Sequence, residues 1–180
     1  LYLRSRKCVP EMLASLRIVI AGAEKLSAKV KHGFMLKFNK EILEGYGTTE
    51  LSPVSSCNLP NELDVSDLTV QVSKKDGTVG LPLPGSAYKI VDPLTMQELS
   101  IGESGLICVS GPQLMKGYLN DEEKTRQVIF EIDGLRWYKT GDKGYLDSEG
   151  FLTIVDRYSR FAKVAGEMVS LSNVEQTILD

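Results

Sequence analysis

Histidine, tryptophan and cysteine are scarce in this sequence, whose 180 residues contain one histidine, one tryptophan and three cysteines. Cys8, Cys57 and Cys108 lie far apart, so they form neither a CxxC metal-binding pair nor an even disulfide framework. We interpret them as buried or free thiols in a reducing compartment, and His32 as a surface or partly buried residue of a helix. The surroundings of the cysteines do not favour a catalytic pair with that histidine.

Long hydrophobic runs are missing as well. No stretch approaches the roughly 18 apolar residues of a membrane-spanning helix, and no apolar run follows the basic residues near Leu1. We therefore expect neither a spanning helix nor a signal peptide in these residues, and a cytoplasmic location. The net charge of −3 gives no general basic field for nucleic acid or an anionic membrane, so any bound anion must be held locally.

The first part of the chain has the pattern of a strand, helix, strand unit. Leu16 to Ala21 is a short run rich in β-branched residues that ends at Gly22, as expected of a parallel strand buried on both faces. Ser27 can cap a helix over Ala28 to Phe38, and a second strand runs from Ile42 into Gly45. Because ligands bind at the carboxyl ends of the strands in such sheets, the loops after the two strands should face one site.

The chain changes character after Pro60. Residues 61–76 are polar and weakly patterned, which indicates a boundary, and short strands between turn signals follow. The expected strands are Ala87 to Val91, Gly105 to Ser110, Leu135 to Tyr138, Gly144 to Leu146 and Phe151 to Val155, with a helix from about Asp121 to Val128. The expected fold class is α/β plus β: the end of a parallel α/β sheet in residues 1–76, then a small antiparallel β-barrel in residues 77–155. A further helix should begin at Ser172, with Glu175 completing a capping box.

The segment Glu44-Gly-Tyr-Gly-Thr-Thr-Glu50 has the composition of a nucleotide-binding loop. Two glycines that flank a tyrosine let the backbone approach a ligand while the ring presents a flat face. The hydroxyls of Thr48 and Thr49 can donate to phosphate oxygens, and Glu50 supplies a carboxylate oxygen suited to Mg²⁺. On composition alone, a glycine-rich turn with a surface acid fits the segment equally well.

The same segment resembles the YGxTE core of the AMP-forming adenylate synthetases, the superfamily of acyl-CoA synthetases, adenylation domains and luciferases. Four further segments resemble motifs of that family in the same order: Leu16 to Glu24, Gly105 to Pro112 with Gly117-Tyr118, Trp137 to Asp142, and Val155 to Arg157 followed by Lys163 and Gly166. The resemblance implies the later part of the family's large domain, then the hinge and the start of its mobile lid in residues 156–180. It also implies an internal fragment, because the family's phosphate loop and adenylation lysine are not found here.

For the nucleotide, the resemblance implies binding of ATP or AMP with Mg²⁺. Tyr46 would stack on adenine, Thr49 would hold the α-phosphate, and Glu50 would be the ligand of Mg²⁺. Thr49 and Glu50 would thereby act in catalysis. The backbone around the nucleotide would come from Gly22, Ala23, Glu24, Gly45 and Gly47.

For the ribose and the hinge, the resemblance singles out three charged residues. Asp142 would accept hydrogen bonds from both ribose hydroxyls, and Arg157 would add donors from the other side. Lys163 would lie near the second half-reaction. Ser159 departs from the family pattern, which has lysine or aspartate two residues after the hinge arginine.

The implied activity is activation of a carboxylic acid as acyl-AMP, followed by transfer of the acyl group to the thiol of CoA or of an acyl carrier protein. The segments Gly22 to Leu26, Asp156 to Lys163 and Gly166 to Ser170 most resemble the fatty-acyl to acyl-carrier-protein synthetase half of bacterial bifunctional 2-acylglycerophosphoethanolamine acyltransferases. Those proteins are associated with the inner membrane through their other half. A generic acyl-CoA synthetase is the alternative within the family.

A second class of function is a non-catalytic β-rich interaction module or a pseudoenzyme fragment. Such a protein has no reason to retain Tyr46, Thr49, Glu50 and Asp142 together, and all four are present. We expect the fragment by itself to be inactive. We also expect it to self-associate, because strands that lack neighbours leave sheet edges that recruit another copy.

Overall fold

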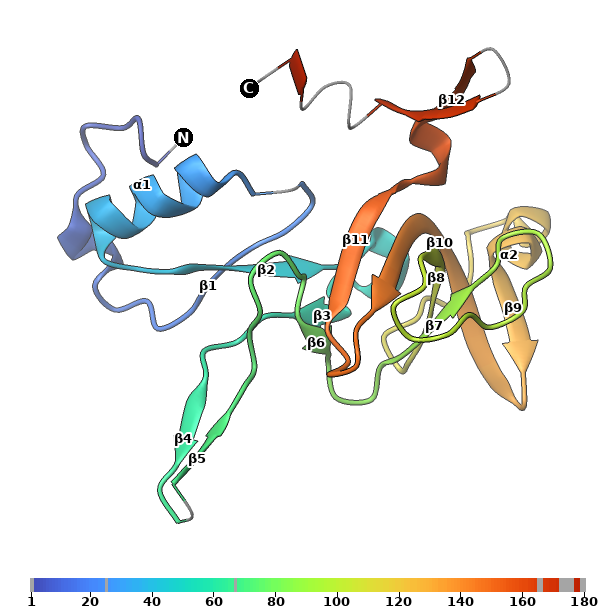
Figure 1. Ribbon diagram of the computed structural model, residues 1–180, viewed down its shortest axis with the longest axis horizontal. Helices are drawn as coiled ribbons and strands as arrows, with labels where there is room; N and C mark the ends of the chain where they lie inside the picture. The colour runs from blue at the N-terminus through green and yellow to red at the C-terminus, as the bar shows by residue number, and fades with distance from the viewer. Residues whose placement is uncertain (1, 25, 67, 165–166, 172–176, 179–180) are drawn as a thin grey trace.

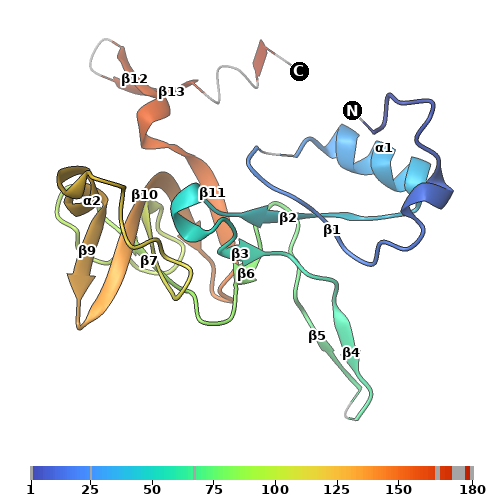
Figure 2. The same ribbon diagram turned by 180° about the vertical axis from the view of Figure 1, so that it is seen from behind.

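The structure is a computed structural model that describes residues 2–24, 26–66, 68–164, 167–171 and 177–178, with residues 161–164 and 167–170 described by their backbone alone. Two main sheets lie side by side, helix α1 lies over the first, and a two-stranded hairpin projects from the body (Figure 1). The view from behind shows α1 and the second sheet at opposite ends of the molecule (Figure 2). Within the described residues, no helix has the length and apolar character needed to cross a membrane.

The first sheet consists of β1 (Val19–Ala21), β2 (Ile42–Tyr46), β3 (Ser56–Cys57) and β6 (Leu81–Pro82), in the order β1-β2-β3-β6. The strands β1 and β2 are parallel, with Val19 opposite Ile42, whereas the other pairs are antiparallel. The expected strand, helix, strand unit is therefore confirmed. The last strand of this sheet comes from beyond residue 76, so the two expected parts of the chain share a sheet.

Helix α1 (Ala28–Phe38) has the bounds that the sequence predicts. The Ser27 side chain accepts a hydrogen bond from the Val30 N–H, and Asn39 ends the helix in the left-handed conformation with φ of 49°. Phe34 and Phe38 are buried against Ile42, and this contact holds the helix to the sheet. His32 is exposed on this helix, as expected. Cys57 and Cys108 are buried and Cys8 is partly buried, and all three are free thiols, which also agrees with the expectation.

The expectation that Leu16 to Ala21 is buried on both faces is wrong for this chain. Val19 and Ala21 pack toward the core under α1, but Ile18 and Ile20 remain 47% and 48% exposed. The reason is that a strand alternates its side chains, and only one face of β1 is covered. Among the described strands β1 pairs only with β2, which leaves its outer edge open.

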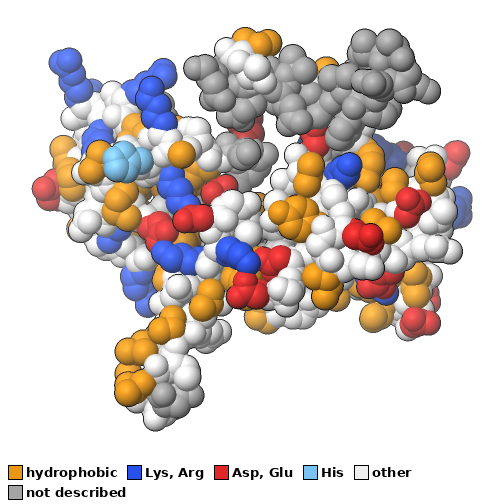
Figure 3. Space-filling view, in the orientation of Figure 1, with side chains coloured by type: hydrophobic (Ala, Val, Ile, Leu, Met, Phe, Trp, Pro, Cys, Tyr) orange, Lys and Arg blue, Asp and Glu red, His pale blue; other side chains and the backbone are white. Residues whose placement is uncertain are grey.

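The segment that the sequence presents as a polar boundary contains a hairpin of β4 (Glu62–Asp64) and β5 (Thr69–Gln71). Leu63 lies opposite Val70 in the register, so the two side chains share one face. Space-filling spheres show hydrophobic side chains gathered on this projecting hairpin (Figure 3). Its exposed aliphatic side chains are Leu63, Val65, Leu68, Val70 and Val72.

The second sheet is antiparallel and contains β7 (Ala87–Val91), β8 (Gly105–Ser110), β9 (Ile129–Ile132), β10 (Leu135–Leu146) and β11 (Leu152–Arg157). Strand β8 lies between β7 and β10, and all six of its residues are buried. The short helix α2 (Glu122–Val128) begins after Asp121, whose side chain accepts a hydrogen bond from the Lys124 N–H. The fold class of α/β followed by antiparallel β is confirmed.

Strand β10 is one strand where the sequence predicts two. The segment between Tyr138 and Gly144 reads as a turn, but the chain continues in the sheet and the register shifts there against both neighbouring strands. The shift is a bulge, which interrupts the ladder without reversing the chain. The next strand, β11, runs on to Arg157 and so reaches further than expected.

Four more short elements are the 3-10 turns η1 (Pro10–Leu13) and η3 (Tyr158–Arg160), and the antiparallel pair β12 (Phe161–Val164) and β13 (Glu167–Ser170). The sequence does not predict the last pair. The helix expected to begin at Ser172, with Glu175 in its capping box, lies outside the described residues.

We expect residues 77–155 to exchange their backbone amide hydrogens more slowly than residues 61–76. The first segment contributes a sheet with a continuous buried core, whereas the hairpin strands β4 and β5 are exposed along their whole length. Hydrogen exchange measured by mass spectrometry would check this difference. Equal protection of the two segments would contradict the division of the chain after residue 76.

Candidate active site

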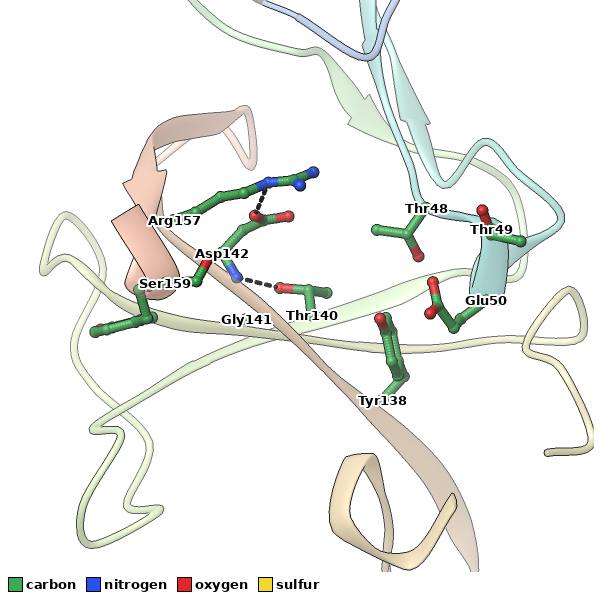
Figure 4. A pocket seen from close by; sticks show the side chains of 10 residues that line it. Thr48, Thr49, Glu50, Tyr138, Thr140, Gly141, Asp142, Arg157 and Ser159 are labelled. Atoms are coloured by element: carbon green, nitrogen blue, oxygen red, sulfur yellow. Dashed lines mark hydrogen bonds and ion pairs between the residues drawn. The ribbon is translucent and has the colours of Figure 1, made fainter. Parts of the chain in front are cut away.

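One pocket of about 390 Å³ lies between the loop after β2 and the bulge of β10. Figure 4 shows Thr48, Thr49 and Glu50 on one side and Asp142 with Arg157 on the other. The full lining is Thr48, Thr49, Glu50, Tyr138, Thr140, Gly141, Asp142, Arg157, Tyr158 and Ser159. Two parts of the chain about 90 residues apart in sequence therefore meet in a single cavity lined mainly by hydroxyl and charged groups.

The short 3-10 turn η2 (Thr49–Leu51) positions Glu50 at the carboxyl end of β2. The Leu51 N–H donates to the Thr48 carbonyl at 3.0 Å, and the fully buried Leu51 side chain anchors the turn in the core. Because Thr48 and Leu51 are fixed on either side of the Thr49-Glu50 pair, the carboxylate of Glu50 is placed at the edge of the pocket. This agrees with the expectation that the loop after the second strand carries the site.

The glycines of this segment make room for the protein's own backbone. A Cβ atom added to Gly47 would lie 1.7 Å from the carbonyl oxygen of Pro53, and one added to Gly45 would lie 3.2 Å from that of Ser56. The close approach that the sequence predicts for a ligand is thus made here by the following loop. Among the described residues, neither glycine lines the pocket.

The bulge in β10 turns Asp142 into the pocket. The Thr140 hydroxyl donates to the Ile107 carbonyl at 2.9 Å and accepts a hydrogen bond from the Asp142 N–H at 3.0 Å. Between them Gly141 has φ of 76°, a conformation that residues with a side chain rarely adopt. Side chains in a regular strand alternate between the two faces of the sheet. The Thr-Gly-Asp sequence interrupts this alternation and so directs the aspartate side chain into the pocket.

Both carboxylate oxygens of Asp142 have partners, although the residue is only 2% exposed. The Tyr46 hydroxyl donates to Oδ2 at 2.6 Å, and the Arg157 Nε lies 2.9 Å from Oδ1. Burial raises the pKa of Asp142, while the hydrogen bond from Tyr46 and the charge of Arg157 oppose that rise. Burial, together with the nearby Asp142 charge, also raises the pKa of Tyr46 far above its ordinary value, so the phenol stays a proton donor.

Glu50 is held by a second tyrosine. The Tyr118 hydroxyl donates to Glu50 Oε1 at 2.7 Å. Burial alone would raise the pKa of Glu50, but this hydrogen bond and one from the backbone outweigh it, so the pKa is lowered and the carboxylate stays ionised at neutral pH. Next to it, the Thr48 hydroxyl oxygen is buried and has no hydrogen-bond partner among the described residues.

These observations fit a divalent cation that is held together with a phosphate ligand. Mg²⁺ is commonly bound by one or two carboxylates, with substrate phosphates and water completing its shell. Within the described chain no cluster of three or more histidine, cysteine or acidic side chains could hold a metal alone. The single carboxylate of Glu50 and the unpartnered Thr48 hydroxyl are the groups that a phosphate-bound cation would use.

The structure brings together four of the residues expected from the sequence: Thr49, Glu50, Asp142 and Arg157. Tyr46 joins them through its hydrogen bond to Asp142, with its ring in the hydrophobic core. The loop of Gly22, Ala23 and Glu24 lies at the same sheet edge, but in the described structure it does not line the pocket. The side chain of Lys163 lies outside the described residues.

Sequence reasoning missed Tyr118 and Tyr138 as residues of the site. Tyr138 lines the pocket, and Tyr118 donates a hydrogen bond to Glu50. Both residues belong to segments that resemble family motifs. In the sequence, this resemblance is the only indication that they belong to the site. A tyrosine in a predicted strand or loop fits a core position equally well.

The fold joins a parallel strand pair to an antiparallel sheet, and the pocket between them places the buried carboxylate of Asp142 opposite hydroxyl groups and a second carboxylate. This arrangement is compatible with an enzyme domain that binds a nucleotide. The sequence pattern of the family described as AMP-binding enzyme matches residues 3–119. The chain belongs to this family.

Curated relatives agree with this assignment. The chain is 38% identical over 169 residues to the probable 4-coumarate–CoA ligase 2 of Dictyostelium discoideum, covering 93% of the chain and 28% of that protein. It is 36% identical over 177 residues to the 4-coumarate–CoA ligase 3 of Oryza sativa subsp. japonica, covering 98% of the chain and 30% of the relative. The chain thus spans about three-tenths of the length of these two relatives.

Solved structures show the same correspondence. ATP-bound MatB from Rhodopseudomonas palustris is 32% identical with a TM-score of 0.76, over 98% of this chain and 32% of the other. The O-succinylbenzoate coenzyme A synthetase (MenE) from Bacillus subtilis, in complex with ATP and magnesium ion, is 28% identical with a TM-score of 0.71, over 97% and 35%. The described fold is therefore that of one segment of an AMP-binding ligase.

Proposed function

We propose that this chain supplies the ribose, α-phosphate and metal-binding part of an ATP-dependent ligase that activates a carboxylic acid. The observation that carries the proposal is the pocket itself, in which Asp142 faces Thr49 and Glu50 across one cavity. A buried, ionised acceptor on one side suits a pair of ribose hydroxyls, and hydroxyl donors with a carboxylate on the other side suit a phosphate and its cation. The family assignment and the ATP-bound structures support this reading.

In the proposed reaction, a carboxylate oxygen of the acid attacks the α-phosphorus of ATP, and the bond to pyrophosphate breaks. The sulfur of a thiol then attacks the acyl carbon, and AMP leaves. Mg²⁺ would neutralise phosphate charge in the first step. Of this chain's own residues, Asp142 and Arg157 orient the ribose, Thr49 donates to the α-phosphate, and Glu50 holds the cation with the phosphates.

The acceptor thiol is proposed to be that of CoA, because the relatives are CoA ligases by name. A narrower proposal has a fatty acid as substrate and an acyl carrier protein as acceptor, in a protein that is membrane-associated through an acyltransferase half. It rests on the segments that begin at Gly22, Asp156 and Gly166. Acyl transfer by the complete protein, measured with CoA and with carrier protein in parallel, distinguishes the two acceptors.

Exchange of labelled pyrophosphate into ATP tests the proposed first step directly. In the complete protein, exchange should require a carboxylic acid and Mg²⁺, and Glu50→Ala should abolish it. Absence of exchange with a broad set of aliphatic and aromatic acids, in a folded protein that also fails to bind ATP, would favour the non-catalytic interaction module instead.

We expect the 180-residue chain alone to show no measurable exchange. Activation depends on positioning and on charge stabilisation around the phosphorus, and the described pocket provides only the ribose side and one carboxylate near the phosphates. The assay is the same exchange reaction at high protein concentration with a medium or long fatty acid. Exchange that Glu50→Ala abolishes would show that the chain is already a complete catalyst.

A further inference from the structure

Tyr118 is bound to Glu50 although 68 residues separate the two positions in the chain. Its hydroxyl donates to Glu50 Oε1 at 2.7 Å, the length of a hydrogen bond to a charged acceptor. Tyr118 does not line the pocket, so it acts on the pocket only through the carboxylate. A carboxylate has two oxygens, and fixing one of them leaves the other for a ligand.

The loop that carries Tyr118 is also bound to the backbone of Glu50. The Met115 N–H donates to the Glu50 carbonyl at 2.9 Å. The guanidinium of Arg136, on β10, donates in turn to the carbonyls of Met115 and Lys116 at 3.2 and 2.8 Å. One loop therefore holds Glu50 at its main chain and at its side chain, and the second sheet holds that loop.

Tyr118 itself is fixed by the start of α2. Its N–H donates to the Thr125 hydroxyl at 2.9 Å, and that hydroxyl donates to the Asp121 carbonyl at 2.9 Å. The Lys124 ammonium lies 4.6 Å from the centre of the tyrosine ring.

We propose that Tyr118 is a positioning residue that holds the Glu50 carboxylate in the orientation needed to bind a divalent cation together with the ATP phosphates. This inference rests on the proposed function. Mg²⁺ tolerates little departure from octahedral geometry, and Glu50 is the only carboxylate in the part of the pocket lining that residues 48–50 form, so a carboxylate free to rotate would bind it poorly. Groups that orient a metal ligand typically change metal affinity by about 10- to 100-fold when they are removed.

The test is Tyr118→Phe in the complete protein, with Mn²⁺ as the spectroscopic probe. Free and bound Mn²⁺ are measured by electron paramagnetic resonance in the presence of saturating ATP. The variant should bind the cation about 10- to 100-fold more weakly, while its affinity for ATP without a metal stays unchanged. The ring of phenylalanine still fits over Lys124, so the melting temperature should stay close to that of the native protein.

Tyr145→Phe is the matched control, because Tyr145 lies on β10 outside the pocket, and this variant should leave the affinity for Mn²⁺ unchanged. Glu50→Gln should weaken Mn²⁺ binding at least as much as Tyr118→Phe. Native affinity for Mn²⁺ in Tyr118→Phe, alongside weak binding in Glu50→Gln, would overturn the positioning role and leave the proposed function intact. Failure of the unmodified protein to bind ATP at all would instead contradict the proposed function.

Discussion

Asp142→Asn in the complete protein should lower ATP-dependent turnover by about 10- to 100-fold. The variant keeps the shape of the side chain and loses the charge that faces the ribose hydroxyls. Hydrogen bonds to charged groups contribute roughly 1.5 to 3 kcal/mol, which corresponds to one to two orders of magnitude in kcat/KM. The carboxylate already accepts from Tyr46 and Arg157, but its two oxygens have about four lone-pair sites, so ribose hydroxyls can bind as well.

The fold should survive this change because asparagine can satisfy both neighbours. Its side-chain oxygen can accept from Arg157, and its amide can donate to the Tyr46 hydroxyl, which then acts as the acceptor. The Arg157 side chain is 58% exposed, so water compensates for the lost ion pair. The effect on binding is therefore separable from an effect on stability.

Pyrophosphate exchange measures the turnover of the variant, and titration with ATP measures its affinity for ATP. Asp147→Asn is the matched control, because Asp147 accepts hydrogen bonds from the backbone of the turn after β10 and lies outside the pocket. That control should leave the affinity for ATP unaltered. If Asp142→Asn also left ATP affinity and turnover at native values, Asp142 would have no part in the site.

The fold was predictable from the sequence where local signals and burial agree. Ser27 and the pattern of Phe34 and Phe38 fix both the bounds of α1 and the face that it buries. Strand β8 is an apolar run between turn residues, and it is central in its sheet. The pattern of β1 looks the same, but its burial depends on what lies beyond its open edge, and the local sequence does not encode this.

The bulge in β10 is a second feature that the local sequence predicts only in part. Thr140 and Gly141 are turn residues by composition, and the sequence correctly indicates that the ladder is interrupted there. Whether the chain then reverses or continues depends on its hydrogen bonds to β8 and β11, which come from distant parts of the sequence. Here the Thr140 hydroxyl, bonded to Ile107, holds the chain in the sheet.

In the candidate site, the two carboxylates could be predicted from the sequence. The contacts with tyrosines that position these carboxylates were found only in the structure. Glu50 was expected because a carboxylate beside two threonines suits a metal, and Asp142 was expected from the resemblance to the family. Their tyrosine partners, Tyr118 and Tyr46, are 68 and 96 residues away from them in the chain. In both pairs a phenol donates to a carboxylate, a contact that tertiary structure alone creates.

Gly47→Ala should destabilise the 180-residue chain by about 3 kcal/mol or more, at the upper end of what overpacking costs. The added Cβ would lie 1.7 Å from the Pro53 carbonyl oxygen and 2.8 Å from the Val54 Cα, and both are backbone atoms. The loop cannot move away freely, because the Ser55 N–H donates to the Tyr46 carbonyl and the Leu83 N–H donates to the Ser55 carbonyl, at 2.9 and 2.8 Å.

Urea unfolding compares this variant with Gly33→Ala, a glycine-to-alanine change that makes only an ordinary van der Waals contact. A Cβ at Gly33 would meet only the end of the Leu3 side chain, at 3.6 Å, and the residue lies inside α1, where alanine is favoured by about 0.5 to 1 kcal/mol. The two variants should therefore shift the unfolding midpoint in opposite directions. A native midpoint for Gly47→Ala would mean that the loop from Pro53 to Ser55 can move without cost. The fixed position of Glu50, which precedes that loop by three residues, would then need another cause.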